Sequence, residues 1–173
     1  VNQPRRHPQW PTPPIVSAVR YGGPEVVRLL IDAGADVTMK LPEDSNAPGL
    51  TSLHTAAIFG CSGSIPLLLA AGADVNAVSS QGFHALYVAA RNSHGEIVRL
   101  LLENSEVNPF DATLNPGGFT PLHAAAQFNA TTALKALLDD GRLPINGLSD
   151  QGCTPLFLAA EYGALQAVKA LLR

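Results

Sequence analysis

The chain has 173 residues, of which 46% are hydrophobic and 14% are charged, and its formal net charge is −3. These values are typical of a globular domain and exclude a disordered or collagen-like chain. The eleven Lys and Arg residues are scattered, so we expect neither nucleic acid nor a membrane surface as a partner. Cys61 and Cys153 are too few for a disulfide framework or a zinc site, which favours a cytoplasmic or nuclear location.

The first 12 residues are predicted to be a proline-rich arm. They contain Arg5-Arg-His-Pro-Gln-Trp-Pro11, whose spacing Arg-x-x-Pro-x-x-Pro is that of segments bound by polyproline-binding grooves. We interpret this segment as an arm that packs over the first repeated unit, and peptide recognition is the alternative. The sequence begins without Met, which suggests that it was processed or excised from a longer chain.

A block of sequence recurs five times after this arm. The blocks start near residues 13, 51, 84, 120 and 154, with start-to-start spacings of 33 to 38 residues. The clearest copy runs from Thr51-Ser-Leu-His54 through Ala56-Ala57 to Gly72-Ala-Asp-Val-Asn76. Periods in this range are typical of stacked repeats. The sequence therefore predicts an all-α repeat solenoid over residues 13–173.

Each block contains the signals of a short first helix. Thr51, Thr120 and Thr154 are placed to cap a helix N-terminus, and a proline follows the last two at a position where its missing N–H costs nothing. Small side chains then recur inside the helix and let a neighbouring helix approach closely. They form the pairs Ala56-Ala57, Ala89-Ala90, Ala125-Ala126 and Ala159-Ala160.

An apolar second helix follows in each block. In the second block Pro66 limits this helix, so we expect Ser64 to cap it and the helix to be shorter by about a turn. In the other blocks the apolar residues have helical spacing, and we expect all of them to form the core. They are Val26, Val27, Leu29 and Leu30; Ile97, Val98, Leu100 and Leu101; Ala133, Leu134, Leu137 and Leu138; and Ala167, Val168, Leu171 and Leu172.

The blocks are joined by segments that we expect to project as β-hairpin fingers. Gly49, Gly82, Gly118 and Gly152 each stand two residues before the next helix start, where a tight turn favours glycine. Two of the fingers are long, at residues 39–50 and 109–119, and insertions of this kind usually lie on the surface. Contact of these fingers with a partner is left open.

Four segments together resemble the signature of the ankyrin repeat family: 34–37 (Gly-Ala-Asp-Val), 52–54 (Ser-Leu-His), 72–76 (Gly-Ala-Asp-Val-Asn) and 120–123 (Thr-Pro-Leu-His). The resemblance implies helix–turn–helix units with projecting fingers and a concave face that binds another protein. It also implies that His54 and His123 form hydrogen bonds to backbone between units, and so are structural and not catalytic. The first and third blocks depart from the Thr-Pro-Leu-His segment.

The sequence contains no recognisable catalytic or cofactor-binding set. There is no glycine loop followed by lysine for phosphate, no Gly-x-Ser-x-Gly elbow, and no histidine pair with metal-ligand spacing. We therefore predict no enzymatic activity, no cofactor and no metal.

Aromatic residues recur at one position near the end of each first helix and predict a partner-binding surface. This column holds Tyr21, Phe59, Asn92, Phe128 and Tyr162, and the resemblance places it on the concave face. Exposed aromatic residues are enriched in binding hot spots. The alternative is that the rings only cover the alanine layer. The candidate partner-binding residues are Tyr21, Leu50, Phe59, Phe83, Arg91, Asn92, Phe119, Gln127, Phe128, Glu161 and Tyr162, and Arg20 is a further polar neighbour.

The predicted function is that of a non-catalytic protein-binding scaffold. The alternative is a regulatory or substrate-recruiting part of a longer enzyme, such as a ubiquitin ligase adaptor or a signalling enzyme. The sequence stops inside the fifth second helix, at Leu171-Leu172-Arg173, without a polar capping repeat. We therefore expect further repeats or self-association at that end.

Overall fold

The computed structural model describes residues 12–109 and 117–173. The chain divides into two compact units, residues 1–85 and 86–173, which are described separately. The polyproline-like segment and most of the second long finger lie outside the described residues, so the expectations for them stay predictions. The same holds for the boundary between an arm, 1–12, and a repeat array, 13–173.

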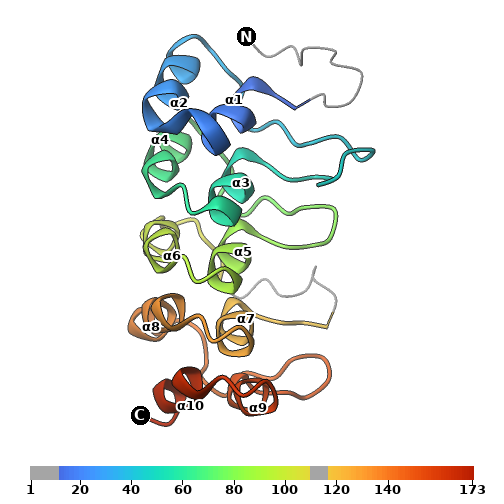
Figure 1. The fold of residues 1–173 in the computed structure, drawn as a ribbon, viewed down its shortest axis with the longest axis vertical. Helices are drawn as coiled ribbons and strands as arrows, with labels where there is room; N and C mark the ends of the chain where they lie inside the picture. Colours follow the sequence, from blue (N-terminus) through green and yellow to red (C-terminus); the bar gives the residue numbers. More distant parts are fainter. Residues whose placement is uncertain (1–11, 110–116) are drawn as a thin grey trace. The chain divides into compact units, whose positions relative to one another are not determined.

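The first unit contains two helix pairs. The first helices of the two pairs pack against each other, and so do the second helices. Figure 1 shows these two layers, with the connecting segments on the side of the first helices. The helices are α1 (Pro14–Ser17), which continues into a π-helical turn (Ala18–Gly22), α2 (Gly23–Asp32), α3 (Ser52–Phe59), a 3-10 turn (Ser62–Ser64) and α4 (Ile65–Ala70).

The second unit contains three helix pairs with the same two-layer arrangement (Figure 1). Helix α7 packs against α9 in one layer, and α8 packs against both α6 and α10 in the other. The helices are α5 (Ala85–Arg91), which begins at the unit boundary, α6 (Gly95–Leu102), α7 (Pro121–Gln127), α8 (Thr131–Asp140), α9 (Pro155–Glu161) and α10 (Leu165–Leu171).

The predicted class, an all-α repeat fold, is confirmed. The connecting segments are less regular than the expected β-hairpins. The described residues contain no β-strand, and a single isolated antiparallel bridge joins Val78 to His84. Adjacent connections still touch: the Ser80 N–H donates to the Pro48 carbonyl at 3.3 Å in the first unit. Gly49, at φ +69°, lies so close that an added Cβ would be 2.5 Å from the Ser80 nitrogen. A side chain at position 49 would therefore separate the two fingers.

The predicted threonine caps begin the first helices. The side-chain oxygens of Thr51 and Thr120 accept from the backbone N–H of the third helical residue, and Thr154 does the same for Phe157. The alanine pairs that follow are buried, apart from Ala160. The capped start and the small side chains together let the first helices pack closely, as the sequence predicts.

Each unit contains one buried histidine that joins two neighbouring repeats. The backbone N–H of Thr51 donates to Nδ1 of His54 at 3.2 Å, so the ring hydrogen is on Nε2, which donates to the Phe83 carbonyl at 2.8 Å. His123 repeats this arrangement with Thr120 and with the Cys153 carbonyl at 3.0 Å. The predicted hydrogen bonds from these histidines to the backbone of the neighbouring repeat are therefore confirmed.

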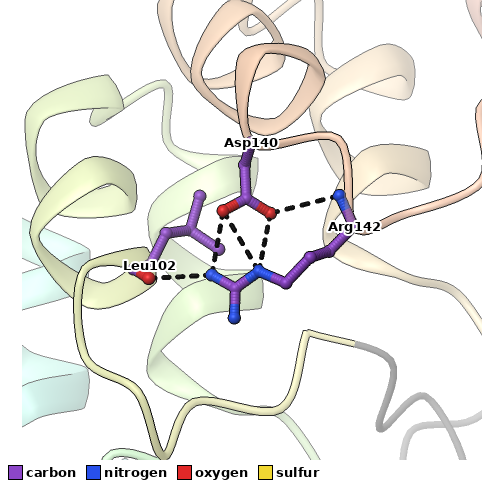
Figure 2. Close-up of polar contacts among 3 residues, drawn as sticks. All are labelled: Leu102, Asp140 and Arg142. Atoms are coloured by element: carbon purple, nitrogen blue, oxygen red, sulfur yellow. Dashed lines mark hydrogen bonds and ion pairs between the residues drawn. The ribbon is translucent and has the colours of Figure 1, made fainter.

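Arg142 ties the fourth repeat to the third within the second unit. Its Nη2 donates to the carbonyl of Leu102, the last residue of α6, at 2.8 Å, and to Oδ1 of Asp140 at 2.9 Å (Figure 2). Its Nε donates to Oδ2 of Asp140 at 2.9 Å. The Asp140 hydrogen bonds raise the pKa of the Arg142 guanidinium further. This arginine thus satisfies a helix-end carbonyl and forms a two-point ion pair with a carboxylate.

The prediction that all apolar residues of the second helices are core is wrong for three of them. Val27, Leu101 and Leu137 are buried as expected, but Val26, Leu29 and Leu172 are 41%, 67% and 68% exposed. Val26 and Leu29 belong to α2, and Leu172 follows α10. The apolar stripe of these helices is wider than the surface that described neighbours cover.

The prediction for the second helix of the second repeat is partly right. Helix α4 has six residues, against ten in α2 and α8, and Pro66 is its second residue, where it removes no helical hydrogen bond. Ser64, however, does not cap the helix with its side chain. Its hydroxyl is buried without a hydrogen-bond partner among the described residues, because residues 62–64 form a 3-10 turn that points it inward.

Replacing this serine by alanine, Ser64→Ala, is expected to stabilise the chain. The substitution removes a buried hydroxyl that has lost its water without gaining a partner, which is worth roughly 1 kcal/mol. Urea unfolding at neutral pH measures the change in the free energy of unfolding. A loss of stability would show that the hydroxyl has a partner, and Ser62→Ala, at a less buried position of the same turn, is the control.

The buried histidines are expected to make the fold sensitive to mild acid. Burial lowers the pKa of His54 from 6.5 to about 4, although the bond to the Phe83 carbonyl opposes the shift, and burial lowers the pKa of His123 as well. The unfolded chain therefore binds protons more readily, so stability is complete above pH 6.5 and falls as the pH drops toward 4.

From about pH 7.5 to about pH 5, His54 alone is expected to cost about 2 kcal/mol of the free energy of unfolding. Urea unfolding at a series of pH values measures this slope. His54→Gln should be less stable at neutral pH and should show a smaller loss on acidification. An unchanged slope in this variant would contradict the assignment of a neutral, buried imidazole.

Candidate protein-binding surface

The part of the chain that the structure describes contains no candidate metal centre. Within residues 12–109 and 117–173, no group of three or more His, Cys, Asp or Glu side chains could hold a metal ion. None of the helices there combines the length and apolar character needed to cross a membrane. Exposed aromatic side chains are the feature that remains.

Four aromatic side chains of the predicted column are exposed. Tyr21 is 75% exposed, Phe59 46%, Phe128 47% and Tyr162 59%. Each lies at or just after the end of a first helix, where the chain turns toward the second helix. Their recurrence at one position of the repeat makes these exposed rings candidates for a contact surface.

In the first unit an arginine joins two of these rings. The guanidinium carbon of Arg20 lies 4.7 Å from the centroid of the Tyr21 ring and 4.3 Å from that of the Phe59 ring. Arg20 and Tyr21 belong to the π-helical turn, whereas Phe59 ends α3 of the next repeat. We call these three residues the first-unit cluster. The contact is of the cation–π type and is worth about 0.5–1 kcal/mol at an exposed site.

The second unit repeats the arrangement with one ring. The guanidinium carbon of Arg91, at the end of α5, lies 4.9 Å from the centroid of the Phe128 ring, which follows α7. We call this pair the second-unit cluster. The Tyr87 hydroxyl is close enough for the Arg91 charge to act on it: burial raises the pKa of Tyr87, and Arg91 opposes the rise. The arginine of one repeat thus lies on the phenylalanine of the next in both units.

The other predicted residues are placed differently. Leu50, Phe83 and Phe119 are half-buried. The Phe119 and His123 rings pack edge to face with their centroids 5.8 Å apart, so internal packing occupies part of the Phe119 ring. The Asn92 side chain donates to the Val88 carbonyl at 2.9 Å. Gln127 is half-buried, while Glu161 is exposed. A continuous concave groove through both units stays a prediction, as does the binding role of each residue.

Two features were missed in the sequence. Arg20 is not among the candidate binding residues that the sequence predicts. An arginine precedes the column position in both the first and the third repeats, and this recurrence is the signal that identifies it. Phe157 occupies the position of His54 and His123 in the fifth repeat and is 52% exposed. Leu165 and Leu172 of the same repeat are also exposed, at 58% and 68%.

Comparison with known protein families matches most of the chain to one family. A family model described as ankyrin repeats (3 copies) matches residues 15–111 and again 107–173. E3 ubiquitin-protein ligase KEG of Arabidopsis thaliana is 34% identical over 111 residues, which are 64% of this chain and 7% of that protein.

Two further relatives match more of the chain. Probable E3 ubiquitin-protein ligase XBOS33 of Oryza sativa subsp. japonica is 37% identical over 128 residues, or 73% of this chain and 23% of that protein. The B-cell lymphoma 3 protein homolog of Mus musculus is 30% identical over 126 residues, or 72% of this chain and 27% of that protein. The chain therefore spans less than a third of each of these relatives.

Removing the two phenylalanine rings is expected to leave the fold intact. Phe59→Ala and Phe128→Ala should each cost no more than about 1 kcal/mol, because the rings are half exposed and leave no cavity in the core. Thermal and urea unfolding measure the cost. Leu53→Ala, at a fully buried position of α3, is the contrasting variant and should cost about 2–5 kcal/mol. A loss of that size for either phenylalanine would make it a core residue.

Proposed function

The chain belongs to the ankyrin repeat family, and on that premise we propose that it is a non-catalytic binding module whose two arginine–aromatic clusters contact a protein partner. Ankyrin repeats generally mediate protein–protein interaction and are typically non-catalytic. The observation that supports the surface is the recurrence of one contact, Arg20 with Phe59 and Arg91 with Phe128. Aromatic residues and arginine are the side chains most enriched at the energetic centres of protein interfaces.

The clusters have the physical properties of a preorganised contact surface. Phe59 and Phe128 each lie at the end of a helix whose start is fixed by a threonine cap and which contains buried alanines such as Ala56 and Ala125. Arginine contacts restrict the rings further, so little conformational entropy remains to be lost on association. The rings also retain large exposed areas, and burying them against a partner supplies favourable free energy.

A second candidate function is that the repeats recruit substrates or partners for a longer enzyme. The observation that favours it is that two relatives are named as ubiquitin-protein ligases and that the chain matches only 7% and 23% of their length. In this case the clusters would hold the protein on which the rest of the enzyme acts. The binding step is the same in both candidates, so one experiment tests it.

Selection of a phage-displayed random peptide library on the purified chain tests the binding surface. We expect peptides whose affinity falls at least about tenfold with the double variant Phe59→Ala, Phe128→Ala, because truncated hot-spot rings cost more than about 1 kcal/mol each. The matched control is Leu29→Ala with Leu165→Ala, which truncates two exposed apolar side chains, one in each unit, outside the clusters. Calorimetry on the synthesised peptides measures the affinities.

The control variant should bind the selected peptides like the unmodified chain. Equal loss in both double variants would indicate nonspecific apolar binding and would contradict the proposed surface. Recovery of peptides that bind the phenylalanine variant with full affinity would place the binding surface elsewhere on the chain.

A further inference from the structure

We propose that Arg20 and Arg91 are carboxylate receptors, so that each cluster binds an acidic protein segment through one Asp or Glu side chain. This inference rests on the proposed function and names the chemistry of its partner. The first observation behind it is how the arginines of this chain are paired.

Five of the described arginines form two groups by their surroundings, and Arg173, the last residue, belongs to neither. Arg28 and Arg99 form ion pairs with Glu25 and Glu96 one helical turn away, and Arg142 is engaged by Asp140 (Figure 2). Arg20 and Arg91 form no ion pair with a described carboxylate and lie over aromatic rings instead. Both guanidinium groups that face the exposed rings therefore carry a charge that no described carboxylate neutralises.

The ring contacts leave the donors of these guanidinium groups available. A guanidinium carries five N–H donors in its own plane, arranged as a fork that matches both oxygens of a carboxylate. The ring contact is made by the charge and needs none of these hydrogen bonds. A bidentate carboxylate could thus add to Arg20 without displacing Tyr21 or Phe59.

Contact with the rings also strengthens the binding of an anion. Rings beside a guanidinium exclude water, and a charged hydrogen bond is stronger where water is excluded. A partner that covers Phe59 while it places a carboxylate on Arg20 would bury an ion pair with both members satisfied. The complementary segment therefore has an acidic residue next to apolar ones.

Protein carboxylates fit these sites better than the phosphates of nucleic acid. Nucleic-acid binding needs many cations along the path of the backbone, and this chain has a net charge of −3 with eleven Lys and Arg in total. Each unit offers one such arginine, and the surrounding rings suit apolar side chains. The acidic character of the rest of the chain also makes a poor surface for polyphosphate.

The same arrangement occurs once in each unit, with a period of two repeats. Arg20 of the first repeat meets Phe59 of the second, and Arg91 of the third meets Phe128 of the fourth. Ile58 precedes Phe59 and Gln127 precedes Phe128, so neither the second nor the fourth repeat supplies such an arginine to the repeat after it. Each unit is therefore a separate receptor for one acidic group.

The test uses peptides selected from the random phage-displayed library on the unmodified chain. We expect the peptides that depend on Phe59 and Phe128 to be enriched in Asp and Glu, and replacement of those residues by Asn and Gln in the peptides should weaken binding about tenfold. Arg20→Gln or Arg91→Gln in the chain should have a similar effect. Arg20→Lys should restore part of the affinity, because it keeps the charge and loses the fork.

Matched controls keep the result interpretable. Arg28→Gln and Arg99→Gln remove exposed arginines of the same units that are already paired, and they should leave affinity unchanged. All variants should melt close to the unmodified chain, since neither Arg20 nor Arg91 is buried.

Three results would overturn the inference. Peptides that lose affinity with Phe59→Ala, Phe128→Ala but keep it with Arg20→Gln and Arg91→Gln would support the proposed function and contradict an acidic partner. Binding of a single-stranded oligothymidylate that is lost with the same two variants would assign the sites to nucleic acid. A library that yields no peptide dependent on Phe59 or Phe128 would contradict both the function and the partner.

Discussion

The fold depends on a neutral imidazole that two repeats share. His54 accepts from the backbone at the start of its own helix and donates to the carbonyl of Phe83 in the next connection, and His123 does the same toward Cys153. One side chain thereby fixes a helix N-terminus and the position of the adjacent repeat. Both imidazoles are fully buried, so an unsatisfied nitrogen would be costly and the geometry is strongly specified.

The residues that stabilise each unit are different from the residues of the proposed binding surface. Histidines, threonine caps and alanines lie inside each unit and hold its layers together, whereas the rings of Phe59 and Phe128 lie half exposed at helix ends with an arginine from the preceding repeat. A surface built in this way can change its side chains without changing the fold.

Local signals in the sequence predicted most of the fold and little of the surface. Threonine caps, the short α4 and the histidine bonds follow from chemistry within a few residues or from the family resemblance, and the structure confirms them. Ser64 failed as a cap because a 3-10 turn, which depends on packing, redirected its hydroxyl. The contact of Arg20 with Phe59 joins residues of different repeats, so no local pattern contains it. Exposure of Leu29 and Leu172 likewise depends on what neighbouring elements cover.

The central claim is that separate residues carry the fold and the binding surface. Deep mutational scanning that reads cellular abundance and peptide binding in parallel tests it most directly. The account predicts that substitutions at His54, His123 and the buried alanines reduce abundance, whereas substitutions at Arg20, Phe59, Arg91 and Phe128 reduce binding at normal abundance. Loss of abundance at the arginine and phenylalanine positions, as severe as at the histidines, would contradict it.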